Sequence, residues 1–292
     1  MVNVIDQLIN GLRTGSIYAL IALGYTMVYG IAKMINFAHG DIIMVGAYAL
    51  YVFVADFNLP VIVAVLFTIA ICAILGVTIE RIAYKPLRKA PPLAVLITAI
   101  GVSFFLQNAA QLIFSANPKP FKSIIKVDSV KIGDVTIAGI TIVIFVVTLV
   151  TMIILTLFIN KTKAGSAMRA VSEDKGAAQL MGINVNRTIS LTFAIGSALA
   201  AIAGILFLSQ YQSVNPTMGA LPGIKAFVAA VLGGIGSIPG AMLGGILLGL
   251  IESISKAYIS SELSDAIVFA VLILVLLLKP SGLLGKKRIE KV

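Results

Sequence analysis

Long uninterrupted apolar runs constrain this chain more than any other feature of its sequence. Residues 61–79, 137–159, 189–208 and 266–278 contain no charged side chain. Several of these runs approach the ~20 residues that a helix needs to cross a ~30 Å hydrocarbon core. Over the whole chain 59% of residues are hydrophobic and 12% are charged, whereas an ordinary soluble domain carries about a quarter charged residues. The chain is therefore expected to lie in a membrane.

The pattern within these runs predicts helices. Backbone N–H and C=O groups in hydrocarbon must be paired within the structure, and a β-barrel strand would alternate apolar and polar residues. The runs are continuous instead. We predict an all-α fold, a polytopic transmembrane helical bundle of about eight or nine spans. Residues 1–292 are expected to form one transmembrane domain.

One stretch does not fit a simple span. Residues 224–232 are apolar but too short to cross, and Gly233, Gly234, Gly236, Pro239 and Gly240 follow. Irregular backbone at membrane depth survives only where protein or water satisfies it, so such breaks usually line a cavity. The sequence leaves open whether 224–240 crosses or re-enters.

Glycines spaced four apart follow this break. This spacing lets two helices approach at backbone distance. We expect tight helix packing, with direct lining of a path as the alternative, at Gly236, Gly240, Gly244, Gly245 and Gly249.

Basic residues set the expected orientation. The formal net charge is +10, and three basic clusters lie in polar segments at 81–89, 161–187 and 286–291. By the positive-inside rule these segments face the cytoplasm, and so does the C-terminus. The placement of the charge indicates a membrane protein and gives no reason to expect nucleic acid as a partner.

Residues for covalent chemistry or metal binding are scarce. The single cysteine, Cys72, excludes an intramolecular disulfide and a cysteine metal site. No phosphate-binding loop of the G-x-x-x-x-G-K-[ST] form occurs, and near Gly285 the hydroxyl position is occupied by Lys287. We therefore expect no enzyme activity, no metal and no cofactor on this chain, so that any ATP must bind to another chain.

A polar group lies between two apolar helices at 36–41. Asn36, His39 and Asp41 bring an amide, an imidazole and a carboxylate there, and a lone Asp at the bilayer centre costs ~2.5 to 3.5 kcal/mol. One interpretation is a turn in which Asp41 caps the next helix. The other is a gate or substrate path, for which the further candidates are Gln107 and Asn108.

The polar excursion 160–187 is patterned. Ser172 is expected to cap a short helix with Glu173 and Asp174 in its first turn, and Gly182 to close it. A solvated connector and a docking surface are both open, and the length of the excursion favours a docking surface.

Four motifs resemble one family. They are Y-A-L-I-A-L-G-Y-T-M-V-Y-G-I from Tyr18, M-I-N-F-A-H-G-D from Met34, A-V-L-G-G-I-G-S-I-P-G-A-M-L-G-G from Ala230 and L-K-P-S-G-L-L-G from Leu278. They are similar to the permease subunits of high-affinity branched-chain amino acid ABC importers, and most of all to the H-type member of the permease pair.

The resemblance implies partners and a site. The partners are a second related permease, two cytoplasmic ABC ATPases that hold ATP and Mg, an extracytoplasmic substrate-binding protein and membrane lipid. The location implied is the cytoplasmic (inner) membrane of a bacterium or archaeon. The ATPase-docking loop of that family matches the segment 160–187 at Gly165, Arg169, Ala170, Glu173, Asp174, Ala177 and Gly182. Ser166 and Ala167 stand where many relatives have a more basic pair.

The resemblance also implies alternating access driven by ATP, with few polar residues in the path. Two other functions stay open from the sequence. One is an ABC permease for urea or short amides, and the other is a stand-alone proton-coupled carrier that uses His39 and Asp41 as a relay. A membrane enzyme is disfavoured because no nucleophile with a partnered base is visible.

Overall fold

The computed structural model describes residues 4–88, 90–133 and 135–285. Within these residues, seven helical segments are long and apolar enough to cross a bilayer. They are α1 (Val4–Ala32), α2 (His39–Tyr51) with a π-helical turn at Val52–Asp56, α3 (Val61–Ile79) with a π-helical turn at Glu80–Tyr84, α4 (Pro92–Phe114), α5 (Gly139–Lys161), α8 (Val185–Tyr211) and α10 (Ile238–Tyr258).

Shorter elements complete the bundle. The short helices are α6 (Lys163–Glu173), α7 (Lys175–Leu180), α9 (Ala220–Gly233) and α11 (Ser264–Leu278). The strands form two small antiparallel pairs, β1 (Lys119–Pro120) with β4 (Ser213–Val214) and β2 (Val130–Ile132) with β3 (Val135–Ile137). The all-α prediction is confirmed.

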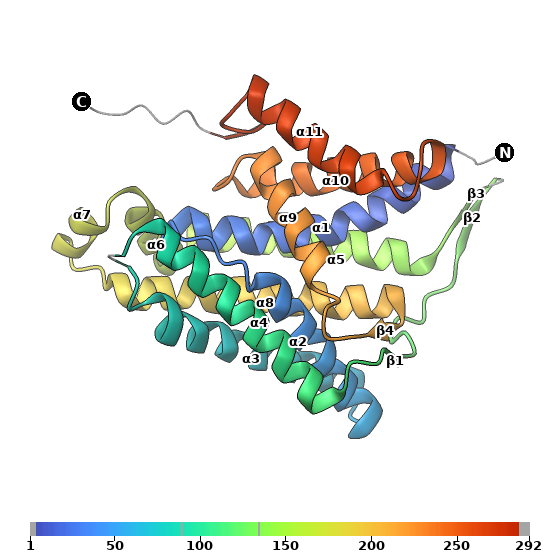
Figure 1. Ribbon diagram of the computed structural model, residues 1–292, viewed down its shortest axis with the longest axis horizontal. Helices are drawn as coiled ribbons and strands as arrows, with labels where there is room; N and C mark the ends of the chain where they lie inside the picture. Colours follow the sequence, from blue (N-terminus) through green and yellow to red (C-terminus); the bar gives the residue numbers. More distant parts are fainter. Residues whose placement is uncertain (1–3, 89, 134, 286–292) are drawn as a thin grey trace.

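Helix α1 forms the centre of the molecule (Figure 1). Residues 15–28 of α1 are all buried, and helices α5, α8, α9 and α10 pack around them. The outer helices α3, α4 and α5 instead expose large apolar side chains, among them Ile62 at 76%, Leu112 at 89% and Ile154 at 60%. Contiguous apolar surface of this kind suits lipid or another membrane subunit.

The two ends of the bundle differ. Helices α6 and α7 lie at one end, which we call the α6–α7 end, and the strand pairs lie at the other (Figure 1). The C-terminal residue of α1 belongs to the α6–α7 end, because the Lys175 ammonium of α7 donates to the Ala32 carbonyl at 3.1 Å.

Glycines let α10 pack closely on its neighbours. A Cβ on Gly245 or Gly249 would collide with the backbone of α1, and one on Gly244 or Gly240 with the backbone of α9. Gly236 has a different role. It precedes α10 with a φ of +98°, and a Cβ there would approach only Gly30, at 3.9 Å. Glycine is favoured at this position because of its left-handed backbone conformation, and helix packing does not require it.

Helix α9 answers the question that the sequence left open. Its 14 residues span about 21 Å, less than a hydrocarbon core. Its N-terminus touches Gly40 inside the bundle, and the turn after it reaches Gly30 near the α6–α7 end. Strand β4, just before α9, pairs with β1 at the opposite end. The segment 213–236 therefore passes from end to end, but only its second part is helical.

Candidate functional site

Two helices begin side by side in the interior. Helix α2 starts at His39 after the break at 33–38, and α9 starts at Ala220. A Cβ on Gly40 would lie 2.5 Å from the Gly219 carbonyl oxygen, and one on Gly223 would lie 2.8 Å from the Gly40 Cα. Only glycine permits this approach. Broken helices whose N-termini meet at mid-bundle are typical of transporter substrate sites.

Two polar side chains tie the first break to outer helices. Asn36 accepts a hydrogen bond from the Tyr84 hydroxyl at 2.9 Å, and both residues are buried. Asp41 accepts one from the Gln107 amide of α4 at 2.8 Å. These bonds fix the break against α3 and α4.

Two path candidates remain, His39 at the start of α2 and Asn108 on α4. His39 is fully buried, with its ring against Gly24 of α1 and edge-to-face with Tyr25 at 4.7 Å. Asn108 is exposed on the outside of α4, where its amide donates to the Phe104 carbonyl at 2.7 Å. Their roles in a path stay predictions.

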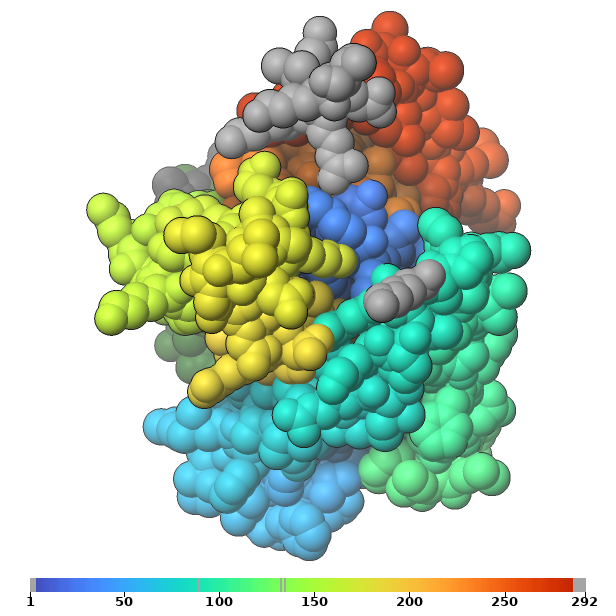
Figure 2. All heavy atoms as spheres, turned by 90° about the vertical axis from the view of Figure 1, so that its left-hand side faces the viewer, coloured from blue at the N-terminus to red at the C-terminus, as the bar shows by residue number. Residues whose placement is uncertain are grey.

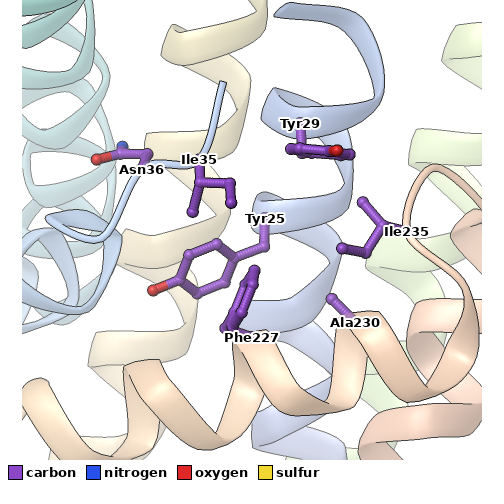
Figure 3. A pocket seen from close by; sticks show the side chains of 7 residues that line it. All are labelled: Tyr25, Tyr29, Ile35, Asn36, Phe227, Ala230 and Ile235. Atoms are coloured by element: carbon purple, nitrogen blue, oxygen red, sulfur yellow. The ribbon is translucent and has the colours of Figure 1, made fainter. Parts of the chain in front are cut away.

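Aromatic side chains fill the space beside the two breaks. Phe227 of α9 lies 5.7 Å from Tyr25 and 5.5 Å from Phe37, measured between ring centroids. The cavity that remains, of about 10 Å³, is lined by Tyr25, Tyr29, Ile35, Asn36, Phe227, Ala230 and Ile235. Figure 3 shows Tyr25 and Phe227 filling its centre, with Asn36 turned away. That volume holds about one water molecule, so this region is closed in the structure.

A buried ionic cluster, which the sequence analysis missed, holds α9 in place. The Lys225 ammonium lies 2.8 Å from Glu252 of α10 and 2.6 Å from Asp265 of α11. Glu252 also accepts hydrogen bonds from Lys256 and, at 2.8 Å, from the Tyr18 hydroxyl of α1. Charged side chains inside a membrane-spanning bundle are costly unless they are paired, and such residues are candidates for a functional role.

A groove lies between α6 and α7 at the α6–α7 end. It has a volume of about 760 Å³. Figure 2 looks onto this end and shows α6 and α7 in yellow, protruding beside the blue end of α1. We call it the α6–α7 groove, and it is lined by Lys161, Thr162, Lys163, Ser166, Ala167, Ala170, Glu173, Asp174, Ala177, Ala178, Met181 and Ile183.

The predicted docking residues divide into two sets. Ala170, Glu173, Asp174 and Ala177 line the α6–α7 groove. The other three residues, Gly165, Arg169 and Gly182, do not belong to its lining.

These three residues shape the backbone around α6 and α7. A Cβ on Gly165 would collide with the Ile159 carbonyl at the end of α5. The Arg169 guanidinium donates to that same carbonyl and, at 3.1 Å, to the Ser166 hydroxyl. Gly182 ends α7 with a φ of +81°. Arg169 therefore fastens α6 to α5.

The expected cap of α7 is corrected. Asp174, not Ser172, accepts from the backbone N–H groups of Gly176 at 2.7 Å and Ala177 at 3.0 Å. Ser172 belongs to α6 and donates to the Arg169 carbonyl. A carboxylate satisfies two N–H donors better than one hydroxyl, and it also suits the positive end of the helix dipole.

Sequence reasoning also missed an apolar tip on α7. Leu180 and Met181 are 90% and 82% exposed. They belong to the polar segment 160–187 and not to a membrane-spanning helix. Two neighbouring apolar residues in a polar excursion were the available signal.

Lys175, the first residue of α7, was also missed. Partial burial lowers the pKa of its ammonium, and the positive charge of Arg88 lowers that pKa further. The Ala32 carbonyl accepts a hydrogen bond from this ammonium.

The part of the chain that the structure describes brings together no group of three or more His, Cys, Asp or Glu side chains that could hold a metal ion.

Comparison with known proteins decides the family. The profile described as "Branched-chain amino acid transport system / permease component" matches residues 7–276. LivH of Escherichia coli K12, a high-affinity branched-chain amino acid transport system permease protein, is 46% identical over 99% of this chain and 97% of its own. The chain belongs to this family.

Other relatives of the permease carry similar descriptions. BraD of Pseudomonas aeruginosa, a high-affinity branched-chain amino acid transport system permease protein, is 47% identical over 99% of this chain and 98% of its own. A probable branched-chain amino acid transport permease protein LivH of Methanocaldococcus jannaschii is 30% identical over 92% and 89%. The resemblance seen in the sequence motifs is confirmed, and these relatives are permeases of transport systems.

Proposed function

We propose that this permease is the membrane subunit of an ATP-driven importer for branched-chain amino acids, in the cytoplasmic membrane of a bacterium or archaeon. The α6–α7 groove carries the proposal. Its lining includes the exposed Glu173, Asp174 and Met181, and the exposed Leu180 directly precedes Met181. Apolar anchors surrounded by charge are typical of protein interfaces.

The α6–α7 end faces the cytoplasm in this proposal. Exposed Arg81, Lys85, Lys161 and Lys163 lie in the segments that bound this end, in agreement with the positive-inside rule. The chain after α11 returns there, because the Leu284 N–H donates to the Gly233 carbonyl at 2.9 Å. The basic tail residues Lys286, Lys287, Arg288 and Lys291 lie outside the described residues.

The partners follow from the family. A second related permease would cover part of the exposed apolar surface, two ABC ATPases would occupy the groove and its counterpart, and an extracytoplasmic binding protein would deliver the substrate at the strand end. ATP and Mg would be held by the ATPases. This chain would supply a docking groove for an ATPase and part of the transport path.

The mechanism is alternating access. ATP binding closes the ATPases, their motion reaches the spans through α6 and α7, and the path between the permeases changes its open side. The transport energy comes from differential binding of the two permease states to the ATPases. In this mechanism the packed rings of Tyr25, Phe37 and Phe227 represent a closed state of the region beside the breaks.

Reconstitution tests the proposal. The permease is co-expressed with two ABC ATPases and a second related permease from the same organism and purified by a tag on this chain. Proteoliposomes are then supplied with the binding protein. We expect the ATPases to co-purify and leucine uptake to require ATP.

A matched pair of variants locates the contact. Ala177→Trp in the groove should lose the ATPases, whereas Ala55→Trp, on an exposed residue near the other end, should keep them. Retention by both variants would contradict docking in the groove.

Two rival functions have their own outcomes. The first is tested by calorimetry of the binding protein. Heat of binding with urea and none with leucine would favour a permease for urea or short amides. Uptake by the permease alone, driven by a pH gradient, would favour the proton-coupled carrier with His39 and Asp41. Asp41 is already bonded to Gln107 and His39 packs on Tyr25, which favours a structural role for both.

A further inference from the structure

The C-terminal end of α1 is held by the segment that forms the α6–α7 groove. Ala32 is the last residue of α1 and is fully buried. Its carbonyl accepts from the Lys175 ammonium at 3.1 Å. The last carbonyls of a helix lack partners within the helix, and a cation there also interacts favourably with the dipole. Lys175 therefore caps a helix 143 residues away in sequence.

Lys175 is rigidly joined to the groove. It is the first residue of α7, directly after the cap residue Asp174, which lines the groove and binds the N–H groups of Gly176 and Ala177. Displacement of α7 by a protein in the groove would displace the Lys175 backbone by the same amount. The ammonium contact passes this displacement to α1.

Beyond Ala32 the chain enters the break that precedes α2. Lys33 adopts a φ of +59°, and Asn36 is held by the Tyr84 hydroxyl at 2.9 Å. Tyr84 ends the same π-helical turn as Glu80, which is fully buried and binds Arg88 and, at 2.6 Å, the Ser190 hydroxyl of α8. The break is thus held on one side by α7 and on the other by α3 and α8.

We propose that Lys175 is the positioning residue through which a protein docked in the α6–α7 groove moves the break between α1 and α2. The inference rests on the proposed function and deepens it, because it names the contact that links the groove to the path. Lys175 touches no substrate. It acts through Ala32 and the short segment 33–38, whose far end holds His39 and Gly40 beside α9.

A cap that only stabilises α1 would behave differently. Loss of such a cap would lower folding stability and reduce uptake and ATP hydrolysis together, through the amount of folded protein. Loss of a linking contact would leave hydrolysis in place and reduce the leucine transported per ATP hydrolysed. The ratio of uptake to hydrolysis separates the two roles.

The test uses the complete transporter in proteoliposomes with Lys175→Met, Lys175→Arg and a control, Lys85→Met, which changes an exposed lysine at the same end. We expect Lys175→Met to keep its ATPases and its hydrolysis while leucine per ATP falls roughly two- to fivefold, the equilibrium change from losing one favourable cation contact at a helix C-terminus. Lys175→Arg should recover most of the ratio, and the control should match the unchanged protein.

Each outcome decides the question. An unchanged ratio in Lys175→Met, or a parallel fall of uptake and hydrolysis, would overturn the inference while the proposed function stands. Failure of the unchanged protein to retain ATPases would overturn the proposed function itself. Thermal unfolding of the detergent-purified complexes shows whether Lys175→Met is folded. If it is not, Lys175→Gln, which keeps a donor without the charge, replaces it, and the same ratio applies.

Discussion

Single residues carry the buried electrostatics of this permease. Lys225 lies between two carboxylates, and Glu252 lies among Lys225, Lys256 and the Tyr18 hydroxyl. Four helices meet at these side chains. The sequence shows each residue as an isolated charge near an apolar run, and the pairing of residues 27 positions apart depends on how α9 folds back on α10.

Removing one side of the buried pair should be costly. We expect Glu252→Leu to lower the free energy of unfolding by about 3 to 5 kcal/mol, because the Lys225 charge loses its most buried partner. Lys256→Ala should cost about 1 kcal/mol or less, because that side chain is 48% exposed. Thermal unfolding of both detergent-purified variants measures the difference. Equal melting temperatures would show that the cluster does not hold α9.

Close backbone contact at Gly40 gives a second prediction at this scale. Gly40→Ala should prevent normal packing of α2 on α9, because its Cβ would lie 2.5 Å from the Gly219 carbonyl oxygen. Gly101→Ala in α4 is the control, since a Cβ there meets nothing within 4 Å, and it should be tolerated. Yield and melting temperature of the purified permease compare them. A Gly40→Ala protein as stable as Gly101→Ala would refute the contact.

Individual helices show what the sequence predicts well. The expected run 61–79 matches α3, and 137–159 differs from α5 by two residues at each end, because charges, prolines and apolar length act locally. Helix α9 was placed too late, at 224, although it begins at Ala220. Its first turn contains Pro222 and Gly223, which are typical of turns. Contact with Gly40 favours helix there, and no local pattern shows that contact.

The cap of α7 gives a prediction at the same scale. Asp174→Ala should weaken α7 by about 1 kcal/mol, because two N–H groups lose their acceptor. Ser172→Ala should leave α7 unchanged. Hydrogen exchange of residues 175–182 should therefore speed up in the first variant only. Faster exchange in Ser172→Ala alone would restore the cap that the sequence suggested.

At the scale of the whole molecule, apolar composition and continuous runs were enough to predict a helical membrane bundle. The candidate site was only partly predictable. The groove residues Ala170, Glu173, Asp174 and Ala177 came from the resemblance, and the structure places them together. Sequence reasoning missed both Lys175 and the apolar tip on α7. The role of Lys175 could not be predicted because its partner lies at the distant end of α1.

Crosslinking from the groove tests the central claim most directly. Cys72 is fully buried, so Ala177→Cys introduces an exposed cysteine into a chain whose own thiol is protected. In membranes that contain the complete transporter, a reagent with a maleimide at one end and a photoreactive group at the other should join this chain to an ATPase. The variant should retain ATP-driven leucine uptake before the reagent is added. Efficient uptake with no crosslink to an ATPase, while the same reagent labels the new cysteine from water, would contradict the account.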